Sequence, residues 1–166
     1  MATGDTLAIF TPYQNEPPSA NYATLDLRNG HPVLDFDGAT DEEAVFTGIL
    51  PRHYGGGGLT IYLHVMFTSA TSGNAYWQVG IERMDDGTLD LDADSFAAWQ
   101  GAAGNPNTVS GKMTLVTITF TAGAQMDSLA AGEMFRLKIR RDADGTAGTD
   151  DVTTDAELVG IEVKET

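Results

Sequence analysis

The sequence predicts an all-β protein: an antiparallel β-sandwich, jelly-roll-like, with short helical turns. Three observations predict it: apolar and polar side chains alternate in repeated runs, helical periodicity is scarce, and glycine- and aspartate-rich turns separate the runs. Strands with one apolar and one polar face are typical of antiparallel sheets that pack together and leave their outer faces in water. We therefore expect antiparallel pairing throughout.

The clearest predicted strand is residues 59–67. Every second side chain there is apolar, so one face carries Leu59, Ile61, Leu63, Val65 and Phe67. The opposite face carries Thr60, Tyr62, His64 and Met66. Other alternating runs predict four more strands, at 77–82, 116–121, 135–140 and 159–164. Three shorter segments are additional candidates, at 7–10, 32–36 and 44–50.

Turn and helix signals separate these strands. Four consecutive glycines, Gly55–Gly58, precede the 59–67 strand, and Asp85-Asp86-Gly87 is a typical turn sequence. Short helices are expected at 96–100 and 126–130.

The length of 166 residues predicts one domain, 1–166. Residues 1–22 contain three prolines, and proline is confined to the edges and loops of sheets. We expect this segment to form an extended N-terminal arm.

The chain is strongly acidic, with 24 Asp and Glu against 9 Lys and Arg and a net charge of -15. Phosphate backbones and anionic lipids repel such a chain, so we expect neither nucleic acid nor a membrane as partner. The absence of cysteine excludes disulfides, a thiol nucleophile and cysteine-based metal sites. The first residues carry neither a basic region nor a long apolar run, so no signal peptide is expected.

One acidic segment imitates the first half of a calcium-binding loop, because Asp90, Asp92 and Asp94 alternate. Ser95 stands where such a loop has its turn glycine, and Gly101 where it has its closing glutamate. We interpret the segment as a solvated acidic loop and expect calcium to be unnecessary.

A second acidic cluster is interpreted as a long flexible hairpin loop between the last two strands; it contains Asp142, Asp144, Asp150 and Asp151. The three histidines have no metal-ligand spacing: His31, His53 and His64. No nucleophile elbow, phosphate-binding loop or zinc-protease motif occurs. We therefore predict no catalytic residues, no metal, no cofactor and no enzyme activity.

One predicted strand is unusually basic, because Arg136, Lys138 and Arg140 share its outward face and Arg141 follows. Like charges in such a row repel one another unless they are paired. Two interpretations stay open: pairing with Glu157 or Glu162 of the last strand, or a subunit interface that sets a basic face against an acidic one. Tyr62 and Met66 are further interface candidates, because exposed tyrosine and methionine are enriched at interfaces.

Three segments carry a resemblance to a known group of proteins: Ala23–Asp37, Phe46–Arg52 and Gln125–Glu133. Together with the closing Ala156-Glu157-Leu158 strand, they resemble a family of small virion structural proteins of tailed bacteriophages. That resemblance implies a β-sandwich capsid decoration (cement) protein that stabilises the head. It further implies a homotrimer on the capsid surface with the major capsid protein or another virion protein as partner, made in the host cytoplasm.

A carbohydrate-binding module, or a fibre or neck protein with a sugar- or host-binding role, is the alternative hypothesis. Sandwich domains often bind glycans through exposed aromatic rings. The sequence offers four aromatic candidates for that role: Tyr54, Tyr62, Tyr76 and Trp99.

Overall fold

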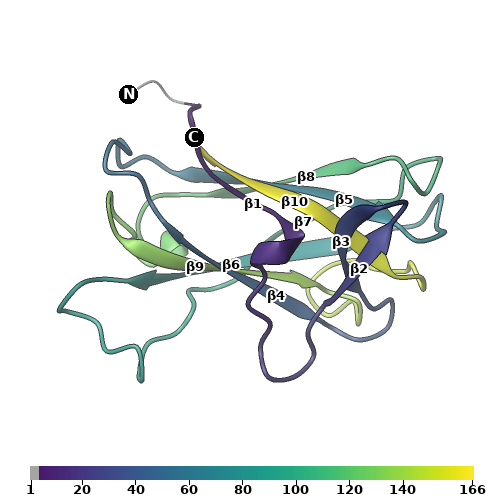
Figure 1. The fold of residues 1–166 in the computed structure, drawn as a ribbon, viewed down its shortest axis with the longest axis horizontal. Helices are drawn as coiled ribbons and strands as arrows, with labels where there is room; N and C mark the ends of the chain where they lie inside the picture. The colour runs from purple at the N-terminus through teal and green to yellow at the C-terminus, as the bar shows by residue number, and fades with distance from the viewer. Residues whose placement is uncertain (1–3) are drawn as a thin grey trace.

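The computed structural model describes residues 4–166 and shows two antiparallel sheets packed face to face (Figure 1). The predicted all-β sandwich is confirmed, with two 3-10 turns and no α-helix in the described part of the chain. The elements follow in the order β1 (Thr6–Phe10), η1 (Pro12–Gln14), β2 (Thr24–Arg28), β3 (His31–Phe36), β4 (Glu43–Ile49), β5 (Leu59–Phe67), β6 (Tyr76–Met84), β7 (Gln100–Ala103), β8 (Thr114–Phe120), η2 (Ala124–Met126), β9 (Met134–Arg141) and β10 (Ala156–Glu165).

The six-stranded sheet is organised around β10. Its strand order is β2-β3-β10-β5-β8, and β1 also pairs with β10. β3 covers Ala156–Leu158 and β1 covers Ile161–Lys164, so the two strands lie end to end along one edge of β10. The turn η1 contacts both β3 and β10 near this junction.

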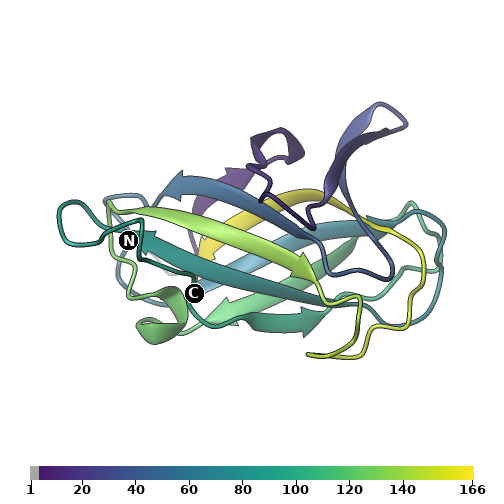
Figure 2. The ribbon, with the colours of Figure 1, turned by 90° about the horizontal axis from the view of Figure 1, so that it is seen from below.

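The four-stranded sheet has the order β4-β9-β6-β7. Figure 2 shows it facing the viewer, with β4 and β6 ending on the side where β9 begins. All strand pairs in both sheets are antiparallel, and a single isolated bridge between Tyr22 and Glu43 is parallel.

The core lies between the inner faces of the sheets. All five apolar side chains predicted on one face of 59–67 are fully buried. From the opposite sheet, Trp77 packs edge-on against Phe36 with ring centres 5.2 Å apart. Alternation in the sequence therefore identified the inner face correctly.

Two strands escaped the sequence analysis, and both predicted helices are wrong. β2 pairs with β3 through the two-residue turn Asn29-Gly30, whose φ angles of 49° and 79° suit Asn-Gly in a type I′ hairpin. β7 lacks alternating apolar residues because it is a short edge strand. Residues 96–99 form no helix, and the second predicted helix is replaced by η2.

The predicted arm 1–22 includes residues 1–3, which lie outside the described residues. Within 4–22, Thr6–Phe10 is strand β1, and Leu7 and Phe10 are buried in the core. This part of the segment belongs to the sheet because Leu7 and Phe10 supply apolar surface that the core covers. No helix in residues 4–166 is long and apolar enough to cross a membrane.

We predict that Leu63→Ala destabilises the fold by about 2–5 kcal/mol, because it leaves a cavity where the side chain is fully buried. The exposed Leu115, on neighbouring β8, is the matched control, and its replacement by alanine should change stability by less than about 0.5 kcal/mol. Denaturant unfolding measures both. Equal losses in the two variants would contradict the assignment of faces.

Candidate ligand-binding surfaces

The basic row of β9 lies on the outer face of the four-stranded sheet. Acidic side chains of this same sheet and of its loops neutralise it: Arg136 pairs with Glu82, Lys138 with Glu43 at 3.5 Å, and Arg140 with Asp41 at 3.3 Å. The predicted partners Glu157 and Glu162 are wrong, because β10 belongs to the other sheet. The prediction that acidic side chains pair with the basic row is correct, but these partners lie on β6, on β4 and in the segment just before β4.

Two aromatic rings cover this basic row. Lys138 Nζ lies 4.6 Å from the ring centre of Phe96 and 4.7 Å from that of Trp99, and the Arg140 guanidinium lies 4.8 Å from Trp99. Gly80, opposite Lys138 on β6, lies beneath both rings. The Ala97 N–H anchors the covering segment by donating to the Ile81 carbonyl at 2.8 Å. The cations are therefore satisfied within one subunit.

The remaining predicted interface residues occupy the outer face of the six-stranded sheet. Tyr62 is half-buried, with Lys164 Nζ 6.0 Å from its ring centre. Met66 is only 8% exposed, which corrects the expectation that it is available on the surface. The use of Arg136, Lys138, Arg140, Tyr62 and Met66 in an interface stays a prediction, as do the homotrimer and the virion location.

The four aromatic candidates for sugar binding are largely covered. Tyr54 is buried, and its hydroxyl donates to the Gly57 carbonyl. The backbones of Gly101 and Gly148 lie against the ring of Tyr76. Trp99 already stacks on two cations.

The open aromatic rings are two that the sequence analysis did not single out, Tyr13 and Tyr22. Their exposed fractions are 66% and 45%. They lie in the segment predicted to be an arm, where neither periodicity nor a motif marked them. Their exposure follows from the fold, because the chain leaves the sheet at η1 and returns to it at β2.

Both tyrosines line one shallow groove of about 250 Å³. The groove lies where β1 gives way to β3, beside η1 and the β2–β3 hairpin, which project from the same side of the sandwich in Figure 2. Its lining is mostly apolar and includes a few neutral polar groups. The lining residues are Pro12, Tyr13, Asn15, Pro17, Tyr22, Ala23, Thr24, Leu25 and Leu34. We call it the Tyr13–Tyr22 groove.

Local hydrogen bonds fix the Tyr13 side of the groove. Pro12 starts η1, where its missing N–H costs nothing, and the Thr11 N–H donates to Gln14 Oε1 at 2.7 Å. Asn15 Oδ1 accepts from the Val45 N–H at 3.0 Å, and the Glu16 N–H donates to the Val45 carbonyl at 2.7 Å. These bonds tie the segment to the edge of β4. They use the side-chain oxygen of Asn15, a residue that lines the groove, and leave its NH₂ as an available donor.

The Tyr22 side is fixed in the same way. Asn21 adopts a left-handed conformation with φ 50°, which asparagine tolerates. Its carbonyl accepts from the Glu43 N–H at 2.8 Å, and the Ala23 N–H donates to the Glu43 carbonyl at 3.0 Å. The groove is thus held by backbone bonds on both sides.

The acidic clusters are organised by hydrogen bonds. The segment 142–155 is not the expected hairpin loop but a crossover between the sheets, because β9 and β10 lie in different sheets. Asp142 accepts from the Ala147 and Gly148 N–H groups at 2.9 and 2.8 Å. In the other cluster, Asp90 accepts from the Asp92 N–H at 3.1 Å.

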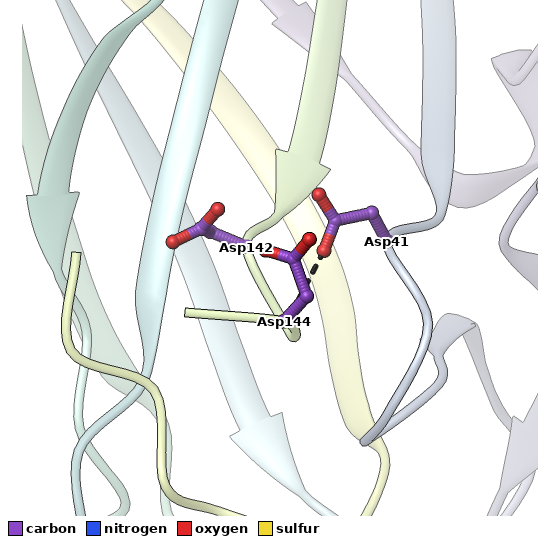
Figure 3. Close-up of side chains that lie close together, drawn as sticks. All are labelled: Asp41, Asp142 and Asp144. Carbon is purple, nitrogen blue, oxygen red and sulfur yellow. Dashed lines mark hydrogen bonds between the residues drawn. The ribbon is translucent and has the colours of Figure 1, made fainter. Parts of the chain in front are cut away.

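Three carboxylates gather closely enough to hold a cation: Asp41, Asp142 and Asp144, with ligand atoms within 4.8 Å of one another. Figure 3 shows Asp41 accepting a hydrogen bond from the Asp144 backbone N–H, at 3.1 Å. The Arg140 guanidinium already faces Asp41, and backbone N–H groups already face Asp142. Asp142 and Asp144 belong to the acidic cluster recognised in the sequence, but nothing in the sequence pattern linked Asp41 to them. In the described chain, no such group includes a histidine.

One carboxyl group of the groove's supporting hairpin is strongly perturbed. Burial, followed by the negative charges of Glu157, Asp26 and Asp155, raises the pKa of Asp35 to about 6. Asp35 lies opposite Glu157 on β10 and Thr24 on β2. Its ionisation therefore opposes the pairing of the β2–β3 hairpin with β10.

No family model matches the chain, and no curated protein matches it. Among solved structures, it is similar to the CBM22-2 xylan-binding domain of Paenibacillus barcinonensis Xyn10C, with a TM-score of 0.54 and 12% identity over 92% of each chain. The CBM22-1 xylan-binding domain of the same protein gives 0.52 and 14% identity, over 99% of this chain and 97% of that one. CBM35 of Cellvibrio japonicus Abf62 gives 0.51 and 10%, over 94% and 92%.

The chain shares its fold with carbohydrate-binding modules. These similarities cover nearly the whole length of both chains, so they concern the complete sandwich. The prediction of a phage capsid decoration protein is wrong on this comparison, because the similar structures are carbohydrate-binding modules. The segments that carried the resemblance are loops and strands without catalytic motifs, so they had little power to separate the two classes.

We predict that Asp35→Asn stabilises the protein at neutral pH and has little effect near pH 4. The raised pKa means that the folded state holds its proton up to about pH 6, so this contribution to stability is lost as pH rises from about 4 through 6. Unfolding free energies of variant and parent across this range measure the effect. Asp86→Asn, in an exposed turn, is the control and should leave the slope unchanged.

We predict that EDTA lowers the melting temperature by no more than about 2 °C, which corresponds to under about 1 kcal/mol at this length. Arg140 and backbone N–H groups already neutralise or bond the Asp41 and Asp142 carboxylates, and the Thr146 N–H donates to the Asp144 carboxylate. Thermal unfolding with EDTA, and after adding calcium back, measures this. A large drop that calcium reverses would establish a structural cation.

Proposed function

We propose that this protein is a non-catalytic carbohydrate-binding module that holds a glycan in the Tyr13–Tyr22 groove. The observation that carries the proposal is the presence of two open tyrosine rings in one apolar groove. The fold shared with CBM22 and CBM35 domains supports the same class of function.

The chemistry of the groove suits sugars. The C–H face of a pyranose ring packs on an aromatic ring, and its hydroxyls need a few hydrogen-bonding groups around that contact. Tyr13 and Tyr22 supply the rings, while the Asn15 NH₂ and the exposed Thr24 hydroxyl supply neutral polar groups. Because the groove is shallow and holds few polar groups, we expect modest affinity.

A catalytic role is disfavoured at this groove. Glycoside hydrolysis ordinarily requires two carboxyl groups on either side of the scissile bond. The residues that line the groove include no aspartate, glutamate or histidine. Binding without turnover is the activity that this lining supports.

We predict that Tyr13→Ala and Tyr22→Ala each weaken glycan binding by about ten-fold, because each removes one stacking surface. Xylan is the first probe, since the CBM22 domains are xylan-binding, followed by other soluble polysaccharides. Affinity electrophoresis and calorimetry measure the binding.

Tyr62→Ala is the matched control, because it removes a half-buried tyrosine from the outer face of the six-stranded sheet without touching the groove. Its affinity should equal that of the parent. Binding that survives both groove substitutions, or absence of binding across the whole panel, would overturn the proposal. Melting curves of all variants establish that they fold.

A further inference from the structure

An apolar row crosses the outer face of the four-stranded sheet at one end. Ile49 and Met84 both lie directly opposite Met134, on the strands to either side of β9. Ile49 is 59% exposed and Met134 41%, and Leu91 of the β6–β7 loop is 59% exposed beside them. We call Ile49, Met84, Leu91 and Met134 the apolar row. It lies where β4 and β6 end, at the left of Figure 2.

Two grooves meet along this row. One, of about 380 Å³, is lined by Met84, Leu91 and Met134, and the other, of about 360 Å³, by Ile49 and Met134. Met134 lines both, so the two form one surface. No aromatic residue lines either groove, so this surface lacks the stacking platform that sugars use.

The surroundings of the row are acidic. Five carboxylates and two arginines line the two grooves: Glu16, Glu82, Asp85, Asp86 and Glu133, against Arg52 and Arg136. Arg136 pairs with Glu82, and Arg83 pairs with Asp85 and Glu133. Glu16, Asp86 and the exposed Asp90 and Asp92 of the adjoining loop carry the remaining negative charge, against Arg52 alone. The rim is therefore negative around an apolar centre.

We propose that the apolar row is a docking surface for a polypeptide segment that presents apolar side chains flanked by lysine and arginine. Methionine side chains are flexible and polarisable, which suits them to peptide contacts of varied shape. The acidic rim attracts a basic segment and repels an acidic one. A second copy of this chain fits poorly, because it carries the same net charge of -15.

This surface is separate from the Tyr13–Tyr22 groove, and the two share no lining residue. The proposal therefore does not rest on sugar binding. A protein with both surfaces would hold a glycan at one and a basic protein segment at the other.

The test is a titration with a short amphipathic peptide that has leucine on one face and lysine on the other. Methyl NMR of the methionines locates the contact: the Met84 and Met134 signals should shift, and those of Met66, Met113 and Met126 should not. A peptide with glutamate in place of each lysine is the ligand control. Binding should weaken as salt rises from about 0.02 to about 0.5 M, because the attraction between exposed charges is screened.

The double variant Ile49→Ser, Met134→Ser should weaken peptide binding by about ten-fold. Met113→Ser with Leu115→Ser is the matched control, because these side chains are equally apolar and are 55% and 53% exposed near the opposite sheet. Equal loss in both double variants, equal binding of the glutamate peptide, or no binding at about 1 mM peptide would overturn the proposal. Shifts of Met84 and Met134 by xylan instead of the peptide would assign the surface to the glycan.

Discussion

The buried ion pair between Arg141 and Asp150 is the interaction on which the two-sheet arrangement depends. Arg141 ends β9 and is completely buried, and its guanidinium binds Asp150 through Nε at 2.9 Å and Nη2 at 2.8 Å. It also donates to the Thr154 carbonyl at 2.7 Å. These bonds hold the crossover 142–155 against the core and so set where β10 enters the other sheet. A charge buried this deeply is tolerable only while paired, since removing one partner typically costs about 3–5 kcal/mol.

The position of β10 in turn creates the Tyr13–Tyr22 groove. β1 and β3 share one edge of β10 and leave a short uncovered stretch between them. In the pairing of β10 with β5, the register shift between Leu158 and Gly160 falls at this uncovered stretch. The chain between β1 and β2 therefore leaves the sheet, turns at η1 and follows the edge of β4. Tyr13 and Tyr22 are exposed because they lie on this detour, and the backbone bonds of the detour keep them in place.

On the outer face of the four-stranded sheet, the basic side chains of β9 are neutralised by acidic side chains of the same chain. On this face, Glu82, Glu43 and Asp41 form ion pairs with the basic side chains of β9. The rings of Phe96 and Trp99 cover the same basic side chains. At the start of β9 the outer face becomes apolar at Met134, and neither Phe96 nor Trp99 lines the grooves beside it. One sheet face therefore carries a closed, charge-balanced half and an open, apolar half.

The sequence by itself determined the fold class and the core. When one face of a sheet packs against a core and the other faces water, two-residue alternation shows which side chains face inward. Leu63 and Phe67 were assigned to one apolar face on that basis, and both are fully buried. It also determined that the basic row of β9 needs partners. Which partners it has, Glu82 and Glu43 in place of Glu157 and Glu162, depends on strand order, and local pattern does not encode which strands become neighbours. Tertiary structure alone decided three other features: the exposure of Tyr13 and Tyr22, the proximity of Asp41 to Asp142, and the apolar row in which Ile49 and Met84 flank Met134. Each of these features unites segments that are separate in sequence and meet only when the sheets form.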